Sequence, residues 1–191
     1  MKRILIATHN PGKLKEFAAL LAPLGIEAIS AGQLGLAEPE ETGASFAANA
    51  RIKALHAMRA SGEMALADDS GLCVAALNGA PGILSSRYGA GDYQAAFQRI
   101  IAAAQAANEW RARFVCALCL AQPDGSTATY IGQSDGVIAP APSGGAGFGY
   151  DPIFIPFGHT GTYAELGATV KDQISHRARA FAQLAARLQG K

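Results

Sequence analysis

The sequence predicts an α/β fold built on a mixed β-sheet. Short apolar runs, too brief for helices, alternate along the chain with segments whose apolar residues recur at helical spacing. Two of these runs flank the turn signal Pro123-Asp124-Gly125, which predicts a hairpin and argues against a purely parallel sheet. Because 191 residues with 50% hydrophobic content can bury one core, we expect a single domain over residues 1–191.

The first strand and the first two helices follow from the apolar spacing of the N-terminal third. Residues 4–7 form an apolar run that is too short for a helix, so a strand is expected there. The apolar residues of 14–24 recur at helical spacing, with Asn10 suited to cap that helix and Pro11 to its first turn. A second helix is expected over 45–60, after a connection rich in Gly and Glu.

The same criteria give the later elements. They are, in chain order, strands over 64–67 and 72–77 around the polar Asp68-Asp69-Ser70-Gly71, a helix around 97–104, hairpin strands over 114–120 and 127–131, a glycine-rich loop over 143–151, an apolar run over 153–155 and a last helix over 175–188. The alternation of strands and helices is typical of the α/β class.

Composition excludes several functions. A formal net charge of +1 provides no global field for nucleic acid or an anionic membrane, so neither partner is expected. The three cysteines lie in apolar runs, and their odd number predicts buried free thiols rather than a disulfide framework. No stretch approaches the ~20 apolar residues of a membrane span, and the N-terminal apolar run is too short for a signal peptide, so a cytoplasmic location is expected.

A candidate phosphate site lies where the first strand meets the first helix. It comprises Thr8, His9, Asn10, Pro11, Gly12 and Lys13. Unpaired N–H groups and the helix dipole favour an anion at such a junction, and Lys13 adds a full positive charge. The spacing is not that of a Walker A loop, and a plain turn with a solvated Lys13 stays an open alternative.

Carboxylates and a lysine form a second candidate group. Asp68 and Asp69 interrupt an apolar stretch, and such oxygen ligands suit a hard ion such as Mg²⁺. A turn capped by Asp and Ser would explain the same residues. Glu40 and Glu41 add carboxylates in the loop before the second helix, although a charge run is ordinarily solvated. On that helix Lys53 lies one turn after Asn49, so both could face a phosphate; an exposed lysine is the alternative.

A candidate base site lies nearer the C-terminus. The glycine-rich loop permits close approach of the backbone to a flat ligand, with Phe148 or Tyr150 able to stack and Asp151 able to accept a hydrogen bond. Lys171, His176 and Arg177 cluster around the start of the last helix and offer a cationic site. A capped helix with solvated His and Arg would be the simpler explanation.

Taken together, these segments resemble the inosine triphosphate pyrophosphatase family along nearly the whole chain. The motifs that carry the resemblance are Thr8-His9-Asn10-Pro11-Gly12-Lys13, Glu40-Glu41-Thr42-Gly43, Asn49-Ala50-Arg51-Ile52-Lys53-Ala54, Ala67-Asp68-Asp69-Ser70-Gly71-Leu72, Gly79-Ala80-Pro81-Gly82, Gly147-Phe148-Gly149-Tyr150-Asp151-Pro152 and Ser175-His176-Arg177. The main departure is His9, where Gly is frequent in the family.

The resemblance implies magnesium-dependent hydrolysis of ITP, dITP and XTP to monophosphate and pyrophosphate, which keeps deaminated purines out of DNA and RNA. It also implies an elongated sheet flanked by helices, two lobes around a central nucleotide cleft, and a homodimer. The implied residue roles are the triphosphate contacts from Thr8 to Lys13, the magnesium ligands Glu40 and Asp69, Asp69 as general base, the substrate contact Ser70, and the base and sugar contacts Phe148, Gly149, Tyr150, Asp151, Lys171, His176 and Arg177.

The physical argument adds that Lys53, with Lys13, stabilises the charge of the triphosphate during catalysis. Glu40 is favoured over Glu41 because of its spacing to Gly43 in the family pattern. Three other functions stay open: a nucleotide sensor without catalysis, an RNA-binding protein, and a pyrophosphatase for pyrimidine or ordinary triphosphates. Carboxylates beside a phosphate site argue against the first unless a metal intervenes, and the near-neutral charge argues against the second.

Overall fold

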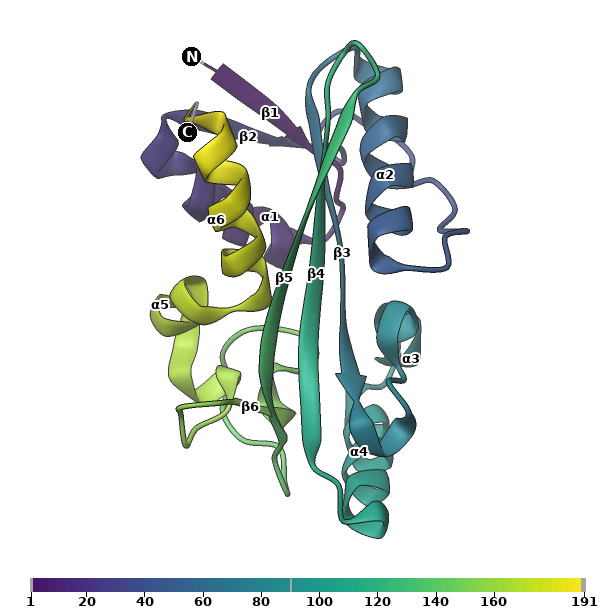
Figure 1. Ribbon diagram of the computed structural model, residues 1–191, viewed down its shortest axis with the longest axis vertical. Helices are drawn as coiled ribbons and strands as arrows, with labels where there is room; N and C mark the ends of the chain where they lie inside the picture. Colours follow the sequence, from purple (N-terminus) through teal and green to yellow (C-terminus); the bar gives the residue numbers. More distant parts are fainter. Residues whose placement is uncertain (1, 90, 190–191) are drawn as a thin grey trace. The chain divides into compact units, whose positions relative to one another are not determined.

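A computed structural model describes residues 2–89 and 91–189 of the chain (Figure 1). The strands of these residues are β1 (Lys2–Ile6), β2 (Ile26–Ser30), β3 (Ala65–Val74), β4 (Arg111–Ala121), β5 (Thr127–Ile138) and β6 (Phe154–Pro156). The α-helices are α1 (Pro11–Leu21), α2 (Phe46–Ser61), α3 (Ser85–Gly89), α4 (Tyr93–Ala107), α5 (Tyr163–Ile174) and α6 (His176–Leu188).

The strands form one mixed sheet in the order β2-β1-β3-β4-β5-β6. β1 pairs in parallel with β2 and with β3, whereas β5 and β6 are antiparallel. β4 and β5 are neighbours joined by a tight turn, in which Gln122 donates its N–H to the carbonyl of Ser126. The predicted α/β class, mixed sheet and hairpin are therefore confirmed.

The described chain divides into two compact units. Unit 1 takes in the described residues of 1–69, 116–132 and 177–191, and unit 2 those of 70–115 and 133–176. β3, β4 and β5 each contribute residues to both units.

Unit 1 has a core on each face of its strands. On one face α1 and α6 pack on β1, β3 and β4 through Ile4, Ile6, Phe17, Leu21, Leu66, Cys116, Leu118, Phe181 and Leu184. On the other face α2 packs through Leu5, Ala50, Ala54, Ala57, Ala65, Ala67, Ala117 and Cys119. Successive strand residues point to opposite faces, which is why Leu5 belongs to one core and its two neighbours to the other. The alanines bring α2 close to the strands, and this places its polar residues near β3.

Unit 2 has an aromatic core. Phe114 lies edge-on to Phe154, with ring centroids 4.8 Å apart, and Phe154 contacts Tyr163 at 5.2 Å. α4 adds Ala96, Phe97, Ile100 and Ala104 to this core. The helix predicted around 97–104 is thus confirmed with its apolar face inward.

Several parts of the predicted element order were wrong. Residues 68–71 do not separate two strands, because β3 runs through them from Ala65 to Val74. Asp68 and Asp69 are buried there, and ion pairs with basic side chains let charged residues continue inside a strand. The short β2 was not predicted, and Lys171 belongs to the last turn of the unpredicted α5 rather than to the start of the last helix.

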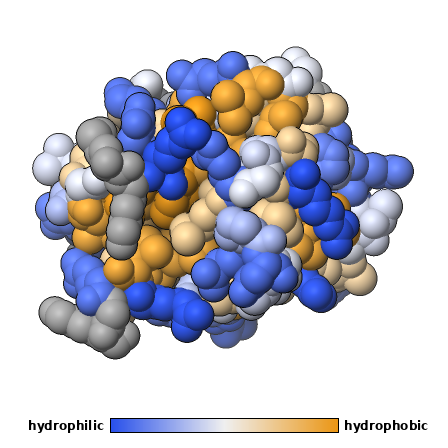
Figure 2. All heavy atoms as spheres, turned by 90° about the horizontal axis from the view of Figure 1, so that it is seen from above, coloured by the Kyte–Doolittle hydropathy of each residue, from blue (hydrophilic) through white to orange (hydrophobic). Residues whose placement is uncertain are grey.

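Cys73, Cys116 and Cys119 are free thiols, as predicted; Cys116 and Cys119 are also buried as predicted, whereas Cys73 is only half-buried. None of the described helices has the length and apolar character that crossing a lipid bilayer requires. Seen from above, hydrophilic and hydrophobic residues are interspersed across the surface (Figure 2).

Candidate active site

The candidate phosphate site of unit 1 is shaped by the cap of α1. Asn10 Oδ1 accepts hydrogen bonds from the N–H groups of Gly12 at 2.9 Å and Lys13 at 3.2 Å, while Pro11 takes the first helical position. Thr8 Oγ1 accepts from the N–H of Asn10 at 3.1 Å. The predicted strand-to-helix turn is therefore present. The Asn10 side chain already accepts the N–H groups of Gly12 and Lys13. An anion at this turn would therefore be attracted by the helix dipole and by the charge of Lys13.

Lys13 faces a carboxylate of the neighbouring strand. Its Nζ lies 3.0 Å from Oδ2 of Asp68, whose side chain is 1% exposed, whereas the Lys13 side chain is 19% exposed. His9 lies at the surface of the same turn. Lys13 is therefore a partly exposed cation that is paired with a buried anion.

A second group joins α2 to β3. Lys53 Nζ lies 2.6 Å from Oε1 of Glu41 and 3.4 Å from Oδ1 of Asp69. Asn49 donates its side-chain N–H to the other oxygen of Asp69 at 3.1 Å and accepts the N–H of Gly43 at 2.8 Å. These bonds hold the acidic loop, α2 and β3 together around the Asp69 carboxylate.

The structure brings Glu41, rather than Glu40, into this cluster. Glu40 is exposed, and within the described part of the chain no ion pair or hydrogen bond of its side chain is present. The metal role implied for Glu40 by the resemblance stays a prediction. Glu41 and Asp69 are the carboxylates that share Lys53.

Burial and neighbouring charges shift the pKa values of Asp69 and Lys53. Burial raises the pKa of the Asp69 carboxyl, and Glu41 adds to this effect, while Lys53 and the amide of Asn49 oppose it without cancelling it. Burial would lower the pKa of Lys53, but the carboxylates of Asp68, Asp69 and Glu41 outweigh it, so the pKa is raised. Lys53 is therefore a firm cation, and Asp69 is a stronger base than an ordinary aspartate.

The donor set fits a magnesium ion that arrives with a nucleotide. Among the described residues, no three His, Cys, Asp or Glu side chains gather into a set that could by itself hold a metal ion. Mg²⁺ in phosphate-handling sites is bound by one or two carboxylates together with substrate phosphates and water. The carboxylates of Glu41 and Asp69 meet that need.

Unit 2 carries the residues of the predicted base site except Arg177. Lys171 Nζ lies 2.7 Å from Oδ2 of Asp151, with both side chains buried, and 4.4 Å from the centre of the Phe148 ring. The same Asp151 oxygen accepts the N–H of Phe148 at 2.9 Å. Gly147 has a φ of 78°, and a side chain there would collide with the Asp151 carboxylate, so the turn requires glycine. These contacts fix a half-buried Phe148 ring beside a cation.

Tyr150 and His176 take different places from those expected. Tyr150 is 4% exposed, donates its hydroxyl to the carbonyl of Ser85 at 2.8 Å and packs edge-on to Tyr93, so its ring belongs to the core rather than to a stacking surface. His176 is buried with its ring stacked on Phe114, the centroids 4.7 Å apart. Between the two aromatic candidates of the loop, Phe148 is the one placed to stack on a ligand.

Arg177 is buried in unit 1 between two carboxylates. It pairs with Oδ2 of Asp68 at 3.0 Å through Nη2 and with Oε2 of Glu16 through Nη1. Glu16 was not identified from the sequence. It lies one helical turn after Lys13 in α1, but its partner is 161 residues away in the chain, so no local pattern could reveal the pair.

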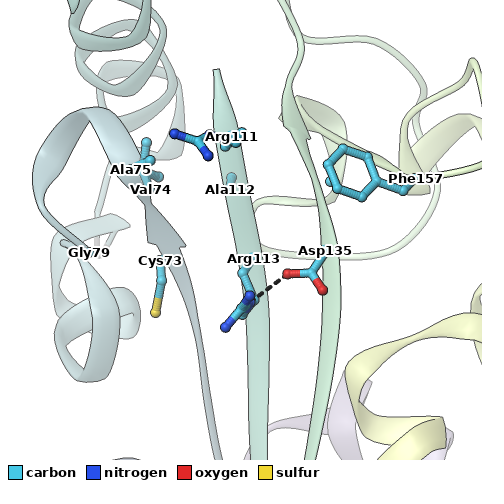
Figure 3. A pocket seen from close by; sticks show the side chains of 10 residues that line it. Cys73, Val74, Ala75, Gly79, Arg111, Ala112, Arg113, Asp135 and Phe157 are labelled. Carbon is cyan, nitrogen blue, oxygen red and sulfur yellow. Dashed lines mark hydrogen bonds and ion pairs between the residues drawn. The ribbon is translucent and has the colours of Figure 1, made fainter. Parts of the chain in front are cut away.

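A further cavity of unit 2 contains none of the predicted site residues (Figure 3). Its volume is about 520 Å³, and it is lined by Cys73, Val74, Ala75, Gly79, Arg111, Ala112, Arg113, Asp135, Gly136 and Phe157. Arg113 pairs with Asp135 at 2.5 Å across it. Burial raises the pKa of the Cys73 thiol, and Arg113 only partly offsets this, so Cys73 is a weak nucleophile.

The fold and these residues define an α/β protein equipped to handle phosphates. Unit 1 combines a helix N-terminus, the cations Lys13 and Lys53, and a basic carboxylate at Asp69. Unit 2 combines a glycine-rich turn with an aromatic ring and a buried ion pair, which are suited to a flat ligand.

The chain belongs to the Ham1 family, whose model matches residues 4–187. A dITP/XTP pyrophosphatase of Rhodopseudomonas palustris is 52% identical, with 96% of this chain and 94% of that protein covered. One of Rhodospirillum centenum is 53% identical, with 96% and 93% covered. The solved structure of a HAM1 protein from Coxiella burnetii matches with a TM-score of 0.89 and 41% identity over 100% of both chains. The Staphylococcus aureus Ham1 protein matches with a TM-score of 0.87 and 38% identity over 99% of both chains. The resemblance seen in the motifs is confirmed.

Proposed function

We propose that this chain hydrolyses deaminated purine nucleoside triphosphates, namely ITP, dITP and XTP, to monophosphate and pyrophosphate with the help of Mg²⁺. The relatives named dITP/XTP pyrophosphatase support the reaction class. The observation that carries the proposal is the Asp69 carboxylate, buried between Lys53 and Asn49 with a raised pKa.

In this mechanism the residues of unit 1 act on the phosphates. Asp69 accepts a proton from a water molecule as that water attacks the α-phosphorus, and pyrophosphate leaves with the bond between the α- and β-phosphates broken. Lys13 and Lys53 bind the phosphate oxygens and stabilise the charge that develops on them. A magnesium ion held by Asp69 and Glu41 would neutralise part of the triphosphate charge.

The residues of unit 2 bind the base. Inosine and xanthosine carry a 6-keto acceptor where adenosine carries an amino donor. A donor aimed at that position, such as the Lys171 ammonium or a backbone N–H of residues 147–151, would be left facing a donor in adenosine, at a cost of about 1–3 kcal/mol per buried group. Phe148 supplies the stacking surface.

Pyrophosphate release from ITP, XTP, ATP and GTP, each with Mg²⁺ and with excess chelator, tests the proposal. We expect magnesium-dependent release from ITP and XTP only, and its loss in Asp69→Asn. Tight binding without release would favour the nucleotide sensor, and equal use of ATP would favour a general triphosphate pyrophosphatase.

The resemblance also supports a homodimer working in the cytoplasm, where free nucleotides are found. Light scattering on purified protein would test the dimer, with a mass of about twice the 19.6 kDa chain expected.

A further inference from the structure

We infer that Arg177 is a positioning residue of the phosphate site, which neutralises Asp68 and so leaves the charge of Lys13 available to the triphosphate. This inference rests on the proposed function and departs from the base contact that the family resemblance implies for Arg177.

The geometry links Arg177 to Lys13 through one atom. Oδ2 of Asp68 lies 3.0 Å from Nη2 of Arg177 on one side and 3.0 Å from Nζ of Lys13 on the other. The other end of the Arg177 fork pairs with Glu16 of α1. The side chains of Arg177 and Asp68 are 2% and 1% exposed, and exposure reaches 19% at Lys13. The Glu16 side chain is 14% exposed, so the buried pair of Arg177 and Asp68 lies between two partly exposed charges, Glu16 and Lys13.

The alternation of negative and positive side chains along this series determines the proposed role of Arg177. Glu16, Arg177, Asp68 and Lys13 alternate in sign, so Asp68 lies between the cations Arg177 and Lys13. Without Arg177, the full negative charge of Asp68 would be buried 3.0 Å from Lys13 and would cancel the charge that should meet a phosphate. Arg177 therefore supplies the second cation that keeps this site attractive to anions.

The guanidinium is also held in place by its shape and surroundings. Its planar fork presents Nη1 to the Glu16 carboxylate and Nη2 to the Asp68 carboxylate, a fixed geometry that the single nitrogen of a lysine cannot reproduce. Its carbon Cζ lies 5.7 Å from the centre of the Phe17 ring of α1. Reaching a base would require Arg177 to give up buried ion pairs, a costly change.

The test separates the phosphate part of the substrate from the base part. Calorimetry would measure the binding of tripolyphosphate with Mg²⁺ and of inosine to the wild type, Arg177→Met and the double variant Arg177→Met/Asp68→Asn. In Arg177→Met we expect tripolyphosphate to bind about tenfold more weakly, because an unbalanced Asp68 competes for Lys13. Inosine binding should stay unchanged. In the double variant the unbalanced charge is gone, so tripolyphosphate binding should recover to within about threefold of the wild type.

The control is Arg187→Met, which removes an exposed arginine from the last turn of the same helix and should change neither affinity. Weaker inosine binding in Arg177→Met with unchanged tripolyphosphate binding would overturn the inference in favour of a base contact. Failure of the double variant to recover would also overturn it. If Arg177→Met alone does not fold, the double variant provides the test, because it also lacks Arg177. If Arg177 contacts the base, the double variant must bind inosine more weakly than the wild type does.

Binding is measured without turnover, so the two proposals fail differently. A wild type that binds tripolyphosphate but releases no pyrophosphate from ITP would overturn the proposed function, and the affinity changes would still decide the role of Arg177. A wild type that binds no tripolyphosphate would overturn both.

Discussion

At Asp69, the charged carboxylate that the proposed chemistry needs lowers the stability of the folded chain. Its buried carboxylate is held by Lys53 and Asn49, yet burial still raises its pKa. In Asp69→Asn we expect ITP hydrolysis to fall about 10²–10⁴-fold, the usual contribution of a general base. In chelator at pH 8 we expect the same variant to be more stable than the wild type by about 1 kcal/mol, as measured by urea unfolding.

The pH dependence of that stability difference follows from the direction of the pKa shift. The ordinary pKa is 3.8, and the folded chain binds the Asp69 proton more tightly than the unfolded chain does. Wild-type stability contributed by this group therefore falls as the pH rises from 3.8 through the raised pKa. The advantage of Asp69→Asn should be largest above that window and shrink below it. A variant less stable than the wild type at pH 8 would contradict this account.

The sequence was sufficient to predict which residues serve this cluster, but it was not sufficient to predict all of their contacts. Lys53 and Asp69 were both predicted to serve the triphosphate, and the structure places them 3.4 Å apart. The choice between Glu40 and Glu41 depends on the backbone of an irregular loop, which periodicity does not specify. The pairing of Arg177 with Glu16 depends on a contact between the two ends of the chain.

At the scale of elements, the cap of α1 stabilises the helix and is expected to contribute to phosphate binding as well. Asp caps a helix as well as Asn does, so Asn10→Asp should leave the free energy of unfolding within about 0.5 kcal/mol of the wild type. The added negative charge at the phosphate site should weaken tripolyphosphate binding about tenfold. Calorimetry and urea unfolding would measure the two effects. Asp92→Asn at the cap of α4 is the control and should change neither quantity. Loss of stability without loss of binding would show that the turn has no phosphate role.

The kink of α5 allows a second prediction for one element. Gly167 has φ 74° and ψ 176°, a conformation nearly restricted to glycine, and a Cβ atom there would lie in open space. Gly167→Ala should therefore cost about 1–3 kcal/mol of stability through backbone strain alone. Thermal unfolding would measure this cost. Gly145→Ala adds a methyl group in open space without a positive φ, so it should leave the stability unchanged in the same experiment. Equal effects of the two substitutions would contradict the strain argument.

Elements were predictable from the sequence where spacing or capping was regular. Asn10 and Ser45 correctly marked the starts of α1 and α2, and the apolar spacing correctly marked α4 and α6. The prediction divided β3 into two strands, because adjacent aspartates in a sequence indicate a loop unless their buried ion-pair partners are known. The five residues of β2 and the kinked α5 carry too little periodicity to be recognised.

At the scale of the molecule, the residues proposed to bind the phosphates belong to unit 1, and those proposed to bind the base belong to unit 2. Hydrogen exchange should therefore respond differently to parts of the substrate. Tripolyphosphate with Mg²⁺ should slow exchange around residues 8–13 and 41–53, and inosine should slow it around residues 147–151 and 171–176. ITP bound to Asp69→Asn should slow exchange in all four segments. Protection by inosine at residues 8–13 would show that the assignment of base and phosphate is wrong.

The division of unit 1 among three chain segments has a consequence for synthesis on the ribosome. Phe181 and Leu184 of α6 complete a core begun by Ile4 and Ile6, and Arg177 in the first turn of the same helix pairs with Asp68 of β3. The phosphate-handling half cannot be assembled until nearly the whole chain has left the exit tunnel. A nonsense mutation before residue 177 would thus release a polypeptide that still carries Lys13, Lys53 and Asp69 but lacks Arg177 and the α6 part of the core.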